Sequence, residues 1–235
     1  MTLRLAHASW PAVTTGMTVL VPIGSTEQHG PHLPLSTDTT VAVAVAERVA
    51  VELGAVLAPA LPYGASGEHQ GFPGTVSIGT DALAVVIVEL VRSISNWAGR
   101  IVIVNGHGGN VAALSYAVPL LRDQGHRVSW VPCAVTGDAH AGRTETSIML
   151  HVASELVDLS RAEPGATAPL HELLSDLASR GVAAVSPNGI LGDPTGAHAF
   201  EGGELLDHMV AGVLRRAAQD IVDERGCRAD PVAAR

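Results

Sequence analysis

The organisation of the chain follows from one stretch, TVLVPIGSTEQHGPHLPLSTD, which spans residues 18–38. Its first part, residues 18–23, is apolar and predicts a buried strand. A polar loop containing Glu27 and His29 follows, and a helical pattern begins just after Asp38. Because α/β proteins carry their chemistry in loops at the carboxyl ends of buried strands, we expect the functional site in this loop.

The remainder of the chain alternates between apolar runs and helical patterns. Further strands are predicted at 55–62, 101–104 and 127–135. Helices are predicted at 40–53, 81–97, 145–151 and 204–224, with another beginning at Val111, and residues 161–180 are predicted to hold loop and helix. The prolines of 55–62 indicate an edge strand or an early end of the strand. This alternation predicts an α/β fold, with a mostly parallel sheet and helices on both faces, in a single domain over 1–235.

Composition excludes several classes of protein. Of the 235 residues, 47% are hydrophobic and 16% are charged, which is typical of a compact globular chain rather than a disordered one. The formal net charge of -9 argues against nucleic acid or an anionic membrane as partner. No stretch approaches the roughly 20 apolar residues of a membrane helix, and no signal peptide is visible, so we expect a cytoplasmic protein. The two cysteines form no framework.

Acidic and histidine side chains occur after three of the predicted strands. We expect five of them to bind metal: Glu27, His29, Asp38, His107 and Glu145. A single loop histidine is usually a surface or hydrogen-bonding group, but the parallel strands should bring all these loops to one edge of the sheet. Imidazole and carboxylate together suit zinc, iron or manganese.

Five protein ligands exceed what one catalytic zinc usually takes, so we expect two divalent metal ions per subunit. Asp38 would be the shared bridge. His29, Asp38 and His107 would form the nitrogen-richer, more zinc-like site. Glu27, Asp38 and Glu145 would form an oxygen-rich site for iron(II) or manganese. Such a pair of cations would activate a water molecule as the nucleophile.

Three further residues in the same loops are candidates for contact with a substrate. His140 lies five residues before Glu145 and could protonate a leaving amine, or else cap a helix or orient a ligand. Glu68 and His69, in a long loop after the second strand, could contact substrate or orient a metal ligand. A hydrogen bond that only stabilises the loop is an equally good interpretation of this pair.

Several motifs in one order resemble the creatininase (creatinine amidohydrolase) family. They are GSTEQHGPHLP at 24–34 with Asp38, FPGT at 72–75, NGHGGN at 105–110, HAGRTETS at 140–147 and GDPT at 192–195. The likeness covers roughly residues 18 to 215. It implies a three-layer α/β/α sandwich, a dinuclear metal centre that hydrolyses a C–N amide bond, and commonly a homo-oligomer that is a hexamer.

The resemblance also implies roles for individual residues. Glu27, His29, Asp38 and His107 correspond to metal ligands and His140 to the catalytic acid. Creatininase itself has a metal-binding glutamate where this chain has Gly109, which shifts the missing carboxylate role toward Glu145. A tryptophan that covers the creatinine substrate is also missing ahead of His140. Creatinine is therefore a doubtful substrate for this chain.

Within the family, the short length and residues 138–147 look most like a branch of peptidases. Those enzymes release a modified C-terminal Val-Tyr dipeptide from a ribosomally made precursor peptide during the biosynthesis of a redox cofactor. Two alternatives remain open at this point. One is a hydrolase of a small cyclic amide or formamide, and the other is a metal-stabilised scaffold subunit without turnover.

Overall fold

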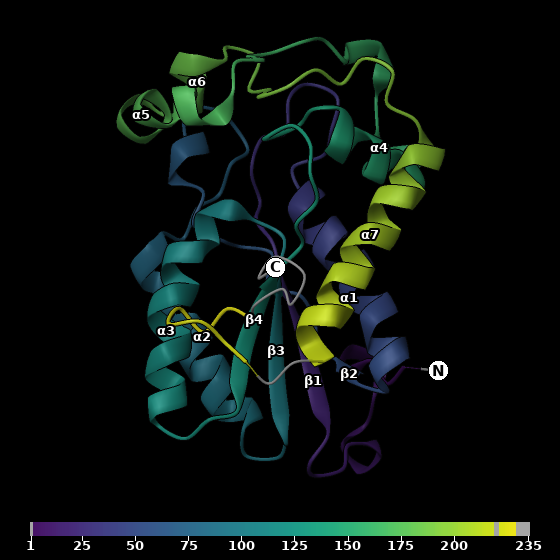
Figure 1. The fold of residues 1–235 in the computed structure, drawn as a ribbon, viewed down its shortest axis with the longest axis vertical. Coiled ribbons are helices and arrows are strands. Elements are labelled where there is room, and N and C mark those ends of the chain that lie inside the picture. The colour runs from purple at the N-terminus through teal and green to yellow at the C-terminus, as the bar shows by residue number, and fades with distance from the viewer. Residues whose placement is uncertain (1, 219–220, 229–235) are drawn as a thin grey trace.

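The computed structural model describes residues 2–218 and 221–228 (Figure 1). Over these residues the centre of the fold is a four-stranded sheet in the order β2-β1-β3-β4, in which every pairing is parallel. The strands are β1 (Thr18–Ile23), β2 (Val56–Leu57), β3 (Arg100–Asn105) and β4 (Val128–Pro132). The prediction of one domain over 1–235 extends beyond the described residues and stays a prediction.

Helices cover both faces of the sheet, which confirms the predicted three-layer α/β/α sandwich (Figure 1). The long helices are α1 (Thr37–Leu53), α2 (Thr80–Ile94), α3 (Val111–Asp123), α4 (Arg143–Val152), α5 (Leu170–Arg180) and α7 (Ala199–Ala218), and a short α6 spans Val182–Val185. Helices α2 and α3 bury their apolar residues against one face in one hydrophobic core. Helices α1, α4 and α7 pack in a second core on the other face.

The central strands are buried because their side chains face a helical layer on each side. In β1 and β3 every residue after the first is buried, which is why both give continuous apolar runs rather than alternation. Strand β2 is an edge strand and also ends early, at Leu57, so both outcomes predicted from the prolines are seen. Pro59 and Pro62 have no N–H to donate, and only an isolated bridge between Ile23 and Leu61 continues the pairing.

Several helix ends differ from those predicted, among them those of α1 and α7. Helix α1 begins at Thr37 rather than Thr40, and Asp38 therefore lies buried in its first turn. Helix α7 begins five residues before Glu204 and ends at Ala218, so 221–224 are not helical, and 219–220 lie outside the described residues. Within the described part of the chain, no helix combines the length and the apolar character needed to cross a membrane.

Candidate metal centre

The loops at the carboxyl edge of the sheet converge on one buried cluster. Glu27 and His29 follow β1, Asp38 begins α1, and His107 follows β3. The loop after β4 brings in His140, and the first turn of α4 adds Glu145. The loop after β2 contributes the 3-10 turn η3 (Gly67–His69) with Glu68 and His69. The structure therefore places all the predicted site residues together.

Asp38 lies at the centre of this cluster, and each of its oxygens faces a different histidine. Its Oδ1 is 3.1 Å from Nε2 of His29, and its Oδ2 is 3.0 Å from Nδ1 of His107. Ser25 also donates a hydrogen bond of 2.8 Å to Oδ2. Burial alone would raise the pKa of Asp38, but the two histidines hold it well below its ordinary value. This is the arrangement expected of a bridging carboxylate.

Glu27 is a buried carboxylate that lies close to three histidines. Its side chain is fully buried, and neither oxygen accepts a hydrogen bond from the described residues. Oε2 is 3.2 Å from Nε2 of His107, and Oε1 is 3.4 Å from Nε2 of His69. Burial and the charge of Asp38 raise the pKa of Glu27 to about 7. A buried carboxylate whose nearest imidazole nitrogens lie at 3.2 Å or more is costly unless a cation lies against it.

His29 and Glu145 form the other side of the cluster. Nδ1 of His29 donates to the backbone oxygen of Glu27 at 3.2 Å, which leaves Nε2 free to face Asp38 and Oε2 of Glu145, the latter at 3.8 Å. The backbone N–H of Ala141 donates to Oε2 of Glu145 at 2.6 Å and fixes that carboxylate. Burial would lower the pKa of His29, but the charge of Asp38 outweighs it and raises the pKa to about 10.

The candidate ligand atoms form groups that differ from the two predicted metal sites. Atoms of Glu27, Asp38 and His107 lie within 4.8 Å of one another, and so do atoms of His29, Asp38 and Glu145. These two groups share Asp38, and each has one imidazole and two carboxylates. A third group, Glu27, His29 and His140, has two imidazoles and one carboxylate. The assignment of these residues as ligands stays a prediction.

The donor set fits a pair of divalent cations. Despite burial, the hydrogen bond and charge of Asp38 raise the pKa of His107 to about 9. Without metal, protons on His107 and His29 therefore balance the buried carboxylates. Cations with a preference for mixed nitrogen and oxygen ligands would replace those protons and also satisfy the bare oxygens of Glu27.

His140 lies over the cluster in a defined tautomer. Its Nε2 is 2.8 Å from the backbone oxygen of Gln28 and 3.0 Å from the side-chain Nε2 of the same residue. Because a carbonyl only accepts, the contact with the backbone oxygen places the hydrogen on Nε2. Nδ1 then holds the lone pair, 3.8 Å from Oε1 of Glu27. Burial, and next the positive charge of His29, hold the pKa of His140 well below its ordinary value. His140 is therefore neutral, and it must gain a proton before it can act as an acid.

Gln28 is a site residue that the sequence analysis missed. Its Nε2 is 2.9 Å from Nδ1 of His69 and 2.9 Å from the backbone oxygen of Gly189, while its Oε1 accepts from the N–H of Gly30. The same Nε2 is also 3.0 Å from Nε2 of His140, but because His140 carries its hydrogen there, the two amide hydrogens go to Gly189 and His69. Nδ1 of His69 is then the acceptor, and its Nε2–H faces Glu27. In the sequence, Gln28 could be recognised as a site residue only by its position between Glu27 and His29. Its amide neither titrates nor commonly binds metal, so its residue type does not indicate a role.

Glu68 and Gly109 lie on the open side of His107. Oε1 of Glu68 is 3.7 Å from Nε2 of His107, and its side chain is partly exposed. A Cβ at Gly109 would collide with the backbone oxygen of Ala65 and with Nε2 of His107. There is consequently no room at position 109 for any side chain while the neighbouring groups keep their places.

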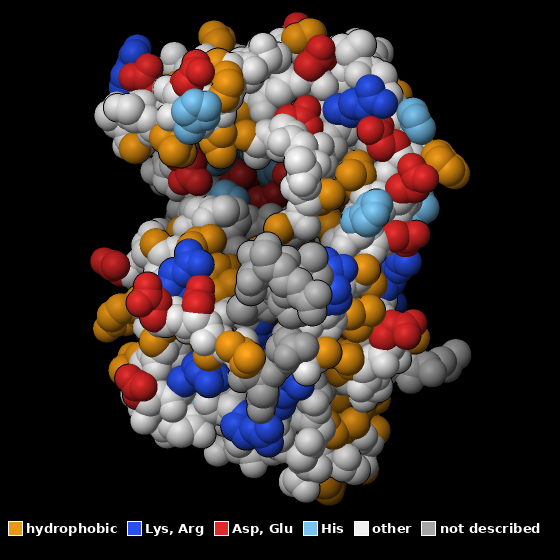
Figure 2. All heavy atoms as spheres, in the orientation of Figure 1, with side chains coloured by type: hydrophobic (Ala, Val, Ile, Leu, Met, Phe, Trp, Pro, Cys, Tyr) orange, Lys and Arg blue, Asp and Glu red, His pale blue; other side chains and the backbone are white. Residues whose placement is uncertain are grey.

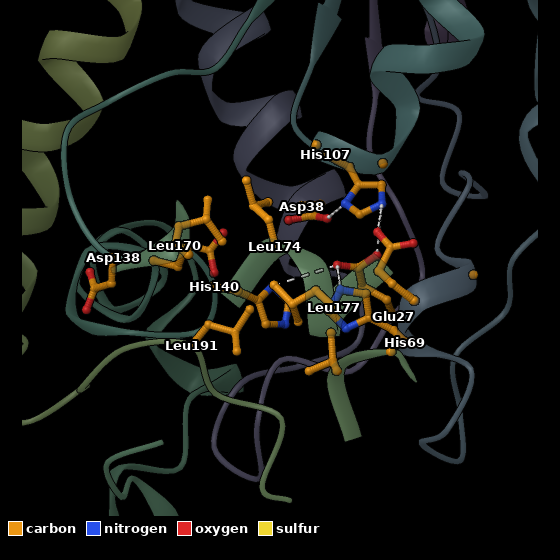
Figure 3. A pocket seen from close by; sticks show the side chains of 18 of the residues that line it. Glu27, Asp38, His69, His107, Asp138, His140, Leu170, Leu174, Leu177 and Leu191 are labelled. Carbon is orange, nitrogen blue, oxygen red and sulfur yellow. Dashed lines mark ion pairs between the residues drawn. The ribbon is translucent and has the colours of Figure 1, made fainter. Parts of the chain in front are cut away.

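A cavity of about 910 Å³ opens onto this cluster. Figure 2 shows it as a hollow whose depth carries acidic and histidine side chains, with hydrophobic side chains gathered along its upper rim. Its polar lining includes Glu27, Asp38, His69, His107 and His140, and Figure 3 shows them together. Leucines of α5 form part of the opposite lining. A substrate in this cavity would meet His140 and the carboxylates directly.

Comparison with known proteins connects this site to one family. Residues 6–217 match the family described as creatininase, creatinine amidohydrolase. A curated relative from Mycolicibacterium smegmatis, named mycofactocin precursor peptide peptidase, is 56% identical over 215 residues, which are 88% of this chain and 87% of the relative. These matches confirm the resemblance that the motifs indicated.

Two solved creatininase structures share the fold. One, a mutant of the Zn–Zn type, is 26% identical with a TM-score of 0.75, and the alignment covers 91% of this chain and 96% of the other. The second, described as creatininase Mn, is 27% identical with a TM-score of 0.74 and the same coverage of 91% and 96%. Both structures thus match nearly the whole of this chain.

Proposed function

The chain belongs to the creatinine amidohydrolase family and is a hydrolase of C–N amide bonds, and we propose that its substrate is the mycofactocin precursor peptide. The bond cleaved would be the one that releases the modified C-terminal Val-Tyr dipeptide. The relative from Mycolicibacterium smegmatis carries the name of this activity at 56% identity. Residues 18–38 and 138–147, on which the resemblance rests, supply most of the buried cluster.

One observation favours a peptide over a small cyclic amide: the size of the cavity above the cluster. Its volume of about 910 Å³ lies near the upper end of the roughly 300–1,000 Å³ of pockets that enclose drug-sized ligands. A cyclic amide the size of creatinine would fill only a small part of that space. A dipeptide with its preceding residue would reach from the carboxylates to the opposite wall.

The cofactor proposed is a pair of divalent ions, zinc with iron(II) or manganese. Glu27, Asp38 and His107 would hold one ion, and His29, Asp38 and Glu145 the other. Bound there, the pair would polarise the scissile carbonyl and lower the pKa of the attacking water. The zinc and manganese forms of the creatininase structures support divalent ions in this fold.

We expect His140 to transfer the proton of the attacking water to the leaving nitrogen. His140 presents the lone pair of Nδ1 to the cluster, so it can take a proton from the attacking water as the new C–O bond forms. The resulting imidazolium gives that proton to the leaving nitrogen as the C–N bond breaks. One water is consumed, and an acid and an amine are released. His140 thus serves as base first and as acid second.

Glu68 and His69 have different parts in this proposal. Glu68 lines the cavity with a partly exposed carboxylate and could accept a hydrogen bond from the substrate. His69 is 4% exposed, lies between Gln28 and Glu27, and has its pKa lowered to about 3 by burial and by His29. A neutral His69 orients Glu27 more readily than it contacts substrate.

The test is a direct comparison of substrates with the purified, metal-loaded protein. Mass spectrometry should detect the dipeptide released from the modified precursor peptide, whereas creatinine should stay intact. His140→Ala should abolish release with metal content unchanged, and His151→Ala, a change at an exposed histidine of α4, should leave release as in the unmodified protein. Hydrolysis of creatinine with no release from the peptide would refute the proposed substrate.

A cytoplasmic location and a hexamer remain predictions, to be measured by fractionation and analytical ultracentrifugation.

A further inference from the structure

Helix α5 presents a row of leucines to the cavity instead of to a hydrophobic core. Leu170, Leu174 and Leu177 are spaced by four and three residues, so they lie on one face of the helix. All three line the cavity that contains His140 and Glu27 (Figure 3). Leu170 is 45% exposed and Leu174 is 54% exposed. We call these three side chains the leucine face.

The leucine face is not explained by the packing of α5. No residue of this helix is buried, and its main packing neighbours are α6 and η3. The charged residues of the helix, among them Glu172, Asp176 and Arg180, are exposed. Several large apolar side chains gathered on one exposed face usually mark a binding surface. Here that surface lines the cavity (Figure 3).

We propose that the leucine face is a subsite that binds an apolar side chain of the peptide next to the scissile bond. We infer a peptide as the occupant because the leucine face and the buried cluster line one cavity, so a substrate bound at the cluster also reaches the leucines. A peptide whose amide lies against His140 extends its neighbouring side chains toward the opposite wall. This inference rests on the proposed peptidase function and adds a preference for apolar residues to it.

A second copy of this chain is the other conceivable occupant. The leucine face lines the same hollow as the carboxylates, so a neighbouring subunit would have to insert a segment above the catalytic cluster to reach it. A peptide substrate must enter that hollow in any case. The geometry therefore favours the substrate, and the oligomeric state of the variants distinguishes the two occupants.

The experiment compares two peptides that differ only in one residue beside the scissile bond, valine in one and alanine in the other. Leu174→Ala should lower kcat/KM for the valine peptide about tenfold through KM, since part of an apolar contact is lost. It should change the alanine peptide less than twofold. Leu159→Ala is the matched control, because Leu159 is 49% exposed and lies outside this cavity. Equal losses for both peptides, or no loss for either, would overturn the subsite.

A binding measurement separates this inference from the proposed function. The valine peptide is titrated into the metal-free protein, which cannot cleave it, and its dissociation constant is measured by fluorescence anisotropy. Leu174→Ala should weaken binding about tenfold, and Leu159→Ala should not weaken it. If the unmodified protein cleaves no peptide but this difference persists, the peptidase proposal fails and the subsite stands. If Leu174→Ala instead dissociates an oligomer and keeps the valine preference, the leucine face is a subunit contact and the subsite is refuted.

Discussion

Glu27 and Asp38 lie in one buried cluster, yet removing their charges should change the stability of the metal-free protein in opposite directions. Burial raises the pKa of Glu27 from its ordinary value of 4.5 to about 7. At about 1.4 kcal/mol per pKa unit, keeping Glu27 ionised at pH 8 costs the folded state about 3 kcal/mol. Glu27→Gln removes this cost, although the new amide also needs hydrogen-bond partners, which offsets part of the gain.

The expected result is a more stable metal-free protein. A gain of about 1–3 kcal/mol corresponds to a rise in melting temperature on the order of 5 °C for a chain of this size. The gain should shrink as the pH falls from 7 toward 4.5, because Glu27 is then protonated in the folded state and increasingly so in the unfolded state. In the presence of zinc or manganese, Glu27→Gln should melt below the unmodified protein, since the variant has lost a proposed ligand and the cation stabilises it little.

Asp38→Asn is the matched control. The pKa of Asp38 is held well below its ordinary value despite burial, so its charge stabilises the fold through His29 and His107. The metal-free Asp38→Asn protein should therefore melt below the unmodified protein at pH 8. Thermal melts of chelator-treated proteins, followed by circular dichroism, measure both variants. A lower melting temperature for Glu27→Gln, or a higher one for Asp38→Asn, would refute the electrostatic account of the cluster.

Three further outcomes follow from the same geometry. His140→Gln should keep both metal ions by elemental analysis and lower kcat by about 10²–10⁴, the range of a lost acid–base group; unchanged turnover would remove His140 from the chemistry. Gly109→Ala should weaken metal binding in a competition assay with a chromogenic chelator, because the new Cβ collides with His107; full affinity would show that His107 is not a ligand. Metal affinity should rise between pH 6.5 and 8, because His29 and His107, with pKa values raised to about 10 and about 9, must release protons when metal binds. Calorimetry in two buffers counts the protons released. If metal binding released no protons, metal ions would not replace the protons on these histidines.

The sequence predicted the layers of the fold and the convergence of the site, and each success has a physical reason. Residues 18–23 and 101–104 are apolar throughout because both faces of those strands are covered, and parallel strands deliver their following loops to one edge. The start of α1 was missed by three residues because 37–39 are polar and look like loop. The fold nevertheless places Asp38 inside the first turn, where it is buried.

The grouping of the ligands could not be predicted from residue types. It depends on which ring nitrogen of each histidine faces the cluster, and backbone contacts decide that. The carbonyl of Glu27 fixes Nδ1 of His29, and the carbonyl of Gln28 fixes Nε2 of His140. The leucine face of α5 could not be predicted from the sequence either. Its spacing predicts an amphipathic helix, but only the fold shows that its apolar side faces a cavity instead of a core.

The resemblance to creatininase implies a metal-binding glutamate at the position of Gly109, and the structure gives a physical reason why this chain has no side chain there. Ala65 and His107 occupy the space that a Cβ would need, and Oε1 of Glu68 lies beside it. A side chain at 109 would therefore displace His107. In the proposed metal centre a carboxylate would therefore have to come from another element. Glu145 is the candidate, because the N–H of Ala141 fixes it near His29. The first turn of α4 would then provide the oxygen that the loop after β3 has no room to carry.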